Sequence, residues 1–131
     1  MAMQKKAMHH GIELEDRLGY AQGVKSDGII FVAAQLSMDE DGKVVGQGDF
    51  AEQLRQCYRN VKKVLSTYGV GMSYVMLETM YVKEGVSLEE MSEIRDEVYK
   101  DKKAIALTVV KVSGLVEEDL LVGVQCVAKV V

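Results

Sequence analysis

Hydrophobic and polar positions follow strand-like spacing over the first third of the chain. Residues 19–24 alternate modestly and residues 28–35 are strand-like, with turn-forming residues at 26–28 between them. This pattern predicts a β-hairpin. Residues 38–48 are rich in acids and glycines, which indicates a loop with room for a short strand at residues 43–45.

Two segments further along the chain have the sequence features of helices. Asp49 and Glu52 have the spacing of a capping box, and apolar side chains then recur every three or four residues until Gly69. Ser87 and Glu90 repeat the capping spacing ahead of a second helix that extends to about residue 98. Strands are expected at residues 74–83, 104–112 and 120–130, which are rich in Val, Leu, Ile, Met and Thr.

The predicted element order is therefore β-β-α-β-α-β-β in one domain that covers residues 1–131. Helices that alternate with strands after an opening hairpin favour an α+β fold, with a mixed β-sheet and two helices packed on one face. The last two strands are apolar on both sides, which a half-solvated sheet does not tolerate. We expect a second copy of the chain to cover the open face, with Val124 on that interface.

Composition narrows the possible partners and location. The net charge is −4, and basic residues are interleaved with acids, so we expect no nucleic-acid partner. No apolar run reaches the roughly 20 residues of a membrane helix, and the N-terminus lacks a signal-peptide pattern. These features predict a cytoplasmic protein without membrane contact. Cys57 and Cys126 lie in apolar periodic segments, where we expect buried, unreactive thiols.

Four segments resemble the RidA/YjgF family of reactive-intermediate deaminases, which is also described as endoribonuclease L-PSP-like. They are GYAQGV at residues 19–24, IIFVAAQ at 29–35, QLRQCYRNVKKVL at 53–65 and VKVSGL at 110–115. With QCVA at residues 125–128, the similarity spans nearly the whole chain after about residue 18. The order and spacing of the segments are more specific than any one of them.

The resemblance implies a chorismate-mutase-like fold and a homotrimer whose sheets form a central barrel. Three clefts between neighbouring subunits would each bind a small-molecule ligand. The implied activity is hydrolysis of enamine or imine intermediates to a 2-oxo acid and ammonia, with neither cofactor nor metal. That chemistry needs a fixed cation for the substrate carboxylate and a positioned water.

The sequence departs from the family at both charged positions of the cleft. The family's arginine, in a Pro-Ala-Arg-Ser/Thr motif, falls on Leu107, and its cleft glutamate falls on Gly123. The two losses are consistent with each other, because a buried carboxylate without its arginine would carry a desolvation penalty. Ala33 and Ala34 replace the usual Ser-Gly pair, which makes that wall less polar.

The resemblance assigns eight residues to the ligand cleft but leaves the catalytic residue unknown. Tyr20 matches the family's cleft tyrosine, although an edge-of-sheet aromatic is an equal alternative. Ser92 falls at a polar helix position, where a solvated serine is the alternative. Gln125 is in phase with Gly123 and is expected to form a hydrogen bond in the cleft or barrel. The full set is Tyr20, Ala33, Ala34, Ser92, Leu107, Val109, Gly123 and Gln125.

Three further groups are interpreted as structural or solvated. Lys111 and Arg95 are expected to be solvated charges, although either is a conceivable replacement for the missing cation. His9 and His10 are interpreted as part of a frayed terminus, because neither Cys nor an acidic cluster stands at metal-ligand spacing.

Two functions remain open at this point. The favoured hypothesis is a trimer whose clefts bind a small neutral or apolar metabolite, with standard imine deamination lost. The alternative is a cofactor-free hydrolase of enamine, imine or related carbonyl intermediates.

Overall fold

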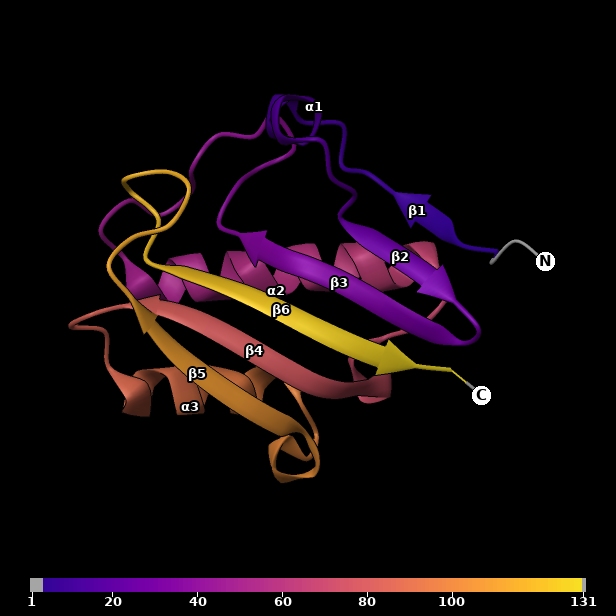
Figure 1. Ribbon diagram of the computed structural model, residues 1–131. Helices are drawn as coiled ribbons and strands as arrows, with labels where there is room; N and C mark the ends of the chain where they lie inside the picture. Colours follow the sequence, from indigo (N-terminus) through magenta and orange to yellow (C-terminus); the bar gives the residue numbers. More distant parts are fainter. Residues whose placement is uncertain (1–3, 131) are drawn as a thin grey trace.

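The computed structural model describes residues 4–130, which form a six-stranded sheet in the order β1-β2-β3-β6-β4-β5 (Figure 1). Only β4 and β5 run parallel, and the other neighbouring pairs are antiparallel. The fold is therefore the predicted α+β class with a mixed sheet. The strands are β1 (Lys6–Met8), β2 (Gly23–Ser26), β3 (Ile29–Leu36), β4 (Val75–Lys83), β5 (Ala106–Val112) and β6 (Val122–Lys129). The helices are α1 (Glu13–Leu18), α2 (Phe50–Thr67) and α3 (Leu88–Val98).

The N-terminal region corrects the sequence interpretation. β1 pairs with β2, and α1 follows it, so the segment with His9 and His10 is not a frayed terminus. The first hairpin strand begins at Gly23 rather than at Gly19, because Gly19 adopts a left-handed conformation (φ 75°) that ends α1. Lys43–Val45 forms no named strand, and an isolated bridge joins Met38 to Val44.

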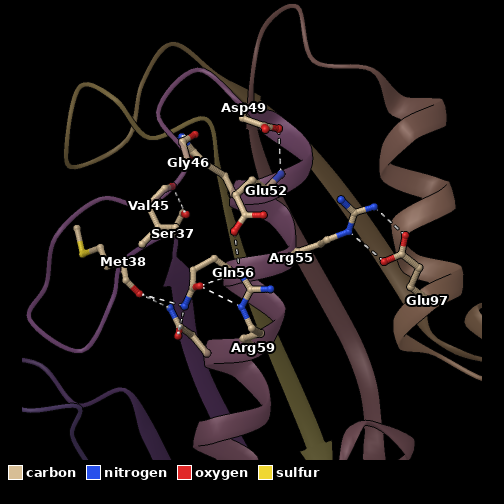
Figure 2. Close-up of polar contacts among 12 residues, drawn as sticks. Ser37, Met38, Val45, Gly46, Asp49, Glu52, Arg55, Gln56, Arg59 and Glu97 are labelled. Atoms are coloured by element: carbon tan, nitrogen blue, oxygen red, sulfur yellow. Dashed lines mark hydrogen bonds and ion pairs between the residues drawn. The ribbon is translucent and has the colours of Figure 1, made fainter.

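Helix α2 begins and ends where its sequence signals predict. The Asp49 carboxylate accepts a hydrogen bond from the Glu52 N–H at 3.1 Å, and Gly69 follows the helix with φ 76°. Polar side chains of α2 also hold the loop after β3, as Figure 2 shows for Gln56, which donates to the Met38 carbonyl. On the other side of the helix, Arg55 forms a two-pronged ion pair with Glu97 of α3 (Figure 2).

Both long helices lie on the same side of the sheet (Figure 1), as predicted. The core between the layers buries alternate residues of the central strands against α2 and α3. Its fully enclosed members include Ile30, Leu54, Val61, Met80 and Val122. A second, smaller cluster packs α1 against the loops, with Ile12, Leu14, Met38 and Leu120 at its centre.

The opposite face of the sheet carries exposed apolar side chains. Phe31 on β3 is 51% exposed, Leu77 on β4 39% and Val110 on β5 36%, which is unusual for large apolar groups on one face of a sheet. Val124 does not belong to this face, contrary to our expectation, because it is 1% exposed in the core beneath the helices. Even-numbered residues of β6 point to the helices, so a subunit contact would involve Val127 instead.

A β-bulge in β3 changes which side chains point to the helices. Val32 pairs with Cys126 and Gln35 pairs with Val124, so three steps along β3 match two along β6. The alternation therefore shifts by one residue after Val32. Gln35 turns into the interior, where it is 1% exposed, while Ala34 turns to the other side.

Candidate functional site

A small cavity lies at the end of the sheet beside the bulge. Its free volume is about 30 Å³, and it is bordered by the segment before α1, the end of β3 and the middle of α2. Tyr20 and Ala34, two of the predicted ligand-site residues, line it. The other lining residues are His10, Ile12, Gln22, Gln35, Leu36, Met38, Asp39, Glu40, Asn60 and Lys63.

The inner wall is a chain of side-chain hydrogen bonds. His10 Nε2 lies 2.8 Å from Gln35 Oε1, and Gln35 Nε2 donates to Gln22 Oε1 at 2.9 Å. Gln22 Nε2 in turn donates to the Tyr20 hydroxyl oxygen at 3.3 Å. Because Gln22 and Gln35 are both buried, each bond replaces contacts that water would otherwise make. The chain fixes the position of Tyr20 against the cavity.

Glu15 binds the backbone of the segment that contains His10, on the N-terminal side of the cavity wall. Its carboxylate accepts hydrogen bonds from the backbone N–H groups of His10 (2.7 Å), Gly11 (2.9 Å) and Ile12 (3.2 Å). Burial alone would raise the pKa of Glu15, but these bonds and one from the Gln22 side chain outweigh it and lower the pKa. An ionised Glu15 therefore ties the chain segment with His10 to the start of α1.

Tyr20 keeps its phenolic proton under ordinary conditions. Burial raises its pKa, and the negative charge of Glu15 adds to the rise, while the hydrogen bond from Gln22 works in the opposite direction. The hydroxyl is therefore available as a hydrogen-bond donor at the cavity. Of the two interpretations of Tyr20 from sequence, the structure favours a residue with a polar role.

Charged groups stand at the rim of the cavity rather than in its wall. Asp39, Glu40 and Lys63 line it, and Glu40 and Lys63 are exposed. The Asp39 carboxylate accepts the N–H groups of Asp41 and Lys43, so it stabilises the turn of the loop. The cavity thus offers amide, imidazole and hydroxyl groups inside and mixed charges outside.

Gly123 and Ala33 lie near this cavity. A Cβ at Gly123 would be 3.8 Å from the Ala34 Cβ, and 3.3 Å from Leu36 Cδ2. Ala33 contributes its backbone, since its N–H donates to the Gln22 carbonyl and its own carbonyl accepts from the Gln35 amide. The structure therefore brings together four of the predicted site residues, Tyr20, Ala33, Ala34 and Gly123.

Three other predicted residues lie at the opposite edge of the sheet. Leu107 and Val109 are on β5, half-buried and packed on the main core. Ser92 on α3 is held by Lys102, whose Nζ donates to the serine Oγ at 2.8 Å, so it is not simply solvated. Two strands, β6 and β4, separate this group from β3 within one chain.

Gln125 lies on the open face of the sheet, in phase with Gly123 and Val127 as predicted. Its Oε1 accepts a hydrogen bond from the Tyr81 hydroxyl at 2.8 Å, although the residue itself is exposed. Lys111 is exposed, as expected.

Arg95 contradicts the prediction of a solvated charge. Its residue is 6% exposed, and Nε donates to the Glu78 carboxylate at 2.7 Å. The sequence missed this pairing because Glu78 lies in an apolar strand on a different element.

The sequence interpretation also missed His10, Gln22 and Gln35, whose contacts come from three separate segments. Of these three, only Gln35 had a local signal in the sequence, because it is a polar residue at the end of the apolar run IIFVAA.

Both cysteines of the chain lie inside the fold. Cys57 and Cys126 are buried free thiols, which confirms their predicted place in the core, and burial raises the pKa of Cys126 to about 12. Within the described range, no group of three His, Cys, Asp or Glu side chains is placed to hold a metal ion. Nor does any helix in that range have the length and apolar character needed to cross a membrane.

Comparisons with known proteins agree with this architecture. The sequence profile of the family described as Endoribonuclease L-PSP matches residues 12–130. A RutC family protein of Pyrococcus horikoshii is 29% identical over 109 residues, which cover 83% of this chain and 85% of the relative. The 3-aminoacrylate deaminase RutC of Acinetobacter baylyi is 29% identical over 111 residues, or 85% of this chain and 86% of that protein.

Solved structures share the fold. A member of the YjgF/YER057c/UK114 family from Mycobacterium tuberculosis superposes with a TM-score of 0.85 at 24% identity, over 97% of this chain and 100% of that one. TdcF of E. coli, solved with bound serine, gives a TM-score of 0.75 at 19% identity, with coverage of 86% and 88%. The fold is thus an α+β domain of the RidA/YjgF type. The chain belongs to the Endoribonuclease L-PSP family, which confirms the resemblance found in the sequence.

Proposed function

We propose that this chain is a ligand-binding member of the family, which assembles as a homotrimer and binds a small neutral molecule in clefts between subunits. The observation that carries the proposal is the inner wall of the cavity, which is built from Tyr20, Gln22, Gln35 and the His10 ring and holds no carboxylate, lysine or arginine side chain. A carboxylate at that wall would lose its hydration, and the lysine among the lining residues, Lys63, is exposed at the rim.

The division of the predicted site residues supports intersubunit clefts. Tyr20 and Ala34 lie at one end of the sheet, whereas Leu107 and Val109 lie at its other edge. A cleft that contains both groups needs a second copy to supply one of them. The exposed apolar side chains of Phe31, Leu77 and Val110 give each copy a surface to bury in such an assembly.

The loss of imine deamination follows from the position that the resemblance assigns to the family's arginine. That position is Leu107, whose side chain packs on the core and has no charge for a substrate carboxylate. The test is ammonia release from freshly generated 2-iminobutyrate, with RutC of Acinetobacter baylyi measured on 3-aminoacrylate as the positive control. Release no faster than the uncatalysed background is the expected result, and a rate near that of the control contradicts the proposal.

A second candidate function is a cofactor-free hydrolase of enamines, imines or related carbonyl compounds. It is favoured by similarity to a relative named as a 3-aminoacrylate deaminase, and by the Tyr20 hydroxyl at a cavity of water-like size. The two candidates differ in one measurement. Under the hydrolase hypothesis, Tyr20→Phe lowers a measurable rate of ammonia release, whereas under the binding hypothesis there is no rate to lower.

A further inference from the structure

One backbone carbonyl fixes the direction of the hydrogen-bond chain that lines the cavity. Gln35 Nε2 lies 3.0 Å from the Ala33 carbonyl oxygen. A carbonyl oxygen can only accept, so the Gln35 side chain must present its NH₂ group there. Its oxygen consequently faces His10 Nε2 at 2.8 Å, and this ring nitrogen must carry a proton.

The same reasoning extends to Tyr20. Gln35 Nε2 also lies 2.9 Å from the Gln22 side chain, which must therefore offer its oxygen. The Gln22 nitrogen is left to donate to the Tyr20 hydroxyl oxygen at 3.3 Å. Because this oxygen already accepts a hydrogen bond, the phenolic proton points to another partner. Donation thus runs in one direction, from His10 through Gln35 and Gln22 to Tyr20.

We propose that His10 is a positioning residue that holds Gln35 in this chain, in the direction fixed by the Ala33 carbonyl, so that Tyr20 donates a hydrogen bond to an acceptor oxygen of the ligand. The ligand class is then a small neutral carbonyl compound. The inference rests on the proposed ligand binding and adds the chemical group that is recognised. It also adds a role for His10, which does not need to touch the ligand.

The cavity has the size for this group. A free volume of about 30 Å³ exceeds the roughly 10–15 Å³ that one water requires, so a carbonyl oxygen fits inside. The alkyl part of the ligand would extend along the apolar part of the wall, at Ala34 and Leu36. Charged groups at the rim stay hydrated and do not need to pair with the ligand.

His10 is held firmly enough to keep its hydrogen bond to Gln35. Its backbone N–H donates to the Glu15 carboxylate at 2.7 Å, and its ring is partly buried against Gln35. The other ring nitrogen, Nδ1, is buried without a partner among the described residues, so a proton on Nδ1 would gain no acceptor there. Moving the proton from Nε2 to Nδ1 would place two lone pairs against each other at the Gln35 contact.

The first test needs no variant. Nitrogen-15 NMR of the intact protein should show His10 with a protonated Nε2, and His9, which is exposed, serves as the internal reference. A neutral His10 protonated only at Nδ1 would overturn the inference, whatever the ligand measurements show.

The second test compares 2-butanone with 2-methyl-1-butene, which replaces the carbonyl oxygen by a CH₂ group of similar shape. Binding of each is measured by NMR titration, and the carbonyl carbon-13 shift reports a hydrogen bond to the ketone. Relative to the alkene, 2-butanone should lose about three- to tenfold in affinity in Tyr20→Phe, the scale of one hydrogen bond. His10→Leu should cause part of that loss, and His10→Gln should restore it, because the glutamine amide also donates.

The outcomes separate the two proposals. Equal ketone-to-alkene ratios in the wild type, Tyr20→Phe and His10→Leu overturn the donor role, while ligand binding itself stands. Failure of both probes to bind overturns the proposed neutral-ligand function as well. His9→Gln, on the neighbouring exposed histidine, is the matched control and should leave both affinities unchanged.

Discussion

Arg95 and Glu78 form a buried ion pair between the sheet and α3, with a distance of 2.7 Å between Nε and Oε1. The Glu78 carboxylate also accepts hydrogen bonds from the hydroxyls of Tyr58 (2.7 Å) and Tyr99 (2.9 Å). Burial works against the charge on Arg95, but the bond to Glu78 outweighs it and raises the arginine pKa. Three elements, β4, α2 and α3, therefore meet at one carboxylate.

Removing one partner of this pair should be costly. Arg95→Met leaves the Glu78 charge buried and uncompensated, so we expect the free energy of unfolding to fall by about 3–5 kcal/mol in urea denaturation. The double variant Glu78→Gln with Arg95→Met should be more stable than Arg95→Met alone, because no charge remains buried.

An exposed ion pair provides the control for that experiment. Arg55 and Glu97 lie 2.9 Å apart but are about half exposed, so Arg55→Met should lower the free energy of unfolding much less than Arg95→Met does. Similar losses for Arg55→Met and Arg95→Met would show that the buried pair contributes little.

Assembly should depend on the open face of the sheet. Phe31→Asp places a charge on a side chain that is 51% exposed in one chain, so the fold should remain while the proposed trimer dissociates. Light scattering should show a monomer mass, and circular dichroism should keep the wild-type spectrum.

Val124→Asp is the matched contrast, because that side chain lies in the core beneath the helices. The substitution should unfold the chain rather than separate folded subunits. If wild-type protein is already monomeric at micromolar concentration, the proposed clefts between subunits have no basis.

Most elements could be predicted from the sequence because their signals are local. Capping residues and helical spacing set the limits of α2 and α3, and runs of apolar residues identified β3 to β6 within a few residues. β1 and α1 carried weak local signals. α1 has Ile12 at its N-cap in place of a side chain that accepts hydrogen bonds, and its first turn is held instead by Glu15.

The candidate site was predicted less completely because it depends on tertiary contacts. Tyr20 and Ala34 were found through family resemblance, and the structure places both at one cavity. The β3 bulge, which no local pattern revealed, turns Gln35 inward and creates the contact with His10. Arg95 was misinterpreted because its partner Glu78 lies in a strand with otherwise apolar neighbours.

Acid should loosen the N-terminal side of the cavity. The Glu15 pKa is below its ordinary value of 4.5 in the folded chain, so its contribution to stability is complete above the ordinary value. That contribution is lost as pH falls through the lower, folded-state pKa. Hydrogen exchange of the backbone N–H groups of Gly11 and Ile12 should therefore accelerate relative to the core at low pH.

Glu15→Gln should lose much of this pH dependence, because it cannot ionise. It should also destabilise the segment by about 1–3 kcal/mol at neutral pH, the scale of hydrogen bonds to a charged group. Glu13→Gln removes an equal charge from an exposed position of the same helix and is the control. If the two variants behave alike, the three backbone bonds do not carry the effect.

The final prediction concerns Leu107 and Gly123, which lie on opposite faces of the sheet within one chain. Gly123 pairs with Tyr81, and Tyr81 pairs with Val110 on the exposed face. Leu107 lies three residues before Val110 on β5, so its side chain points to the opposite face and packs on the core. The acid nearest in register to Leu107 is Glu78, its direct partner on β4. A direct contact between residues 107 and 123 thus requires two copies.

A double-mutant cycle of Leu107→Arg and Gly123→Glu tests that contact. Gly123 has no positive φ, and a Cβ there meets Leu36 Cδ2 at 3.3 Å, so a small adjustment of the leucine admits the side chain. In the assembled protein we expect a favourable coupling of at least about 1 kcal/mol, measured by denaturant unfolding.

The same cycle in a Phe31→Asp background should show no coupling, because separated chains cannot join the two positions. Coupling that persists in the dissociated protein would arise within one chain, which the sheet geometry excludes for a direct contact. Additive effects in the assembled protein would instead show that Leu107 and Gly123 do not share a cleft.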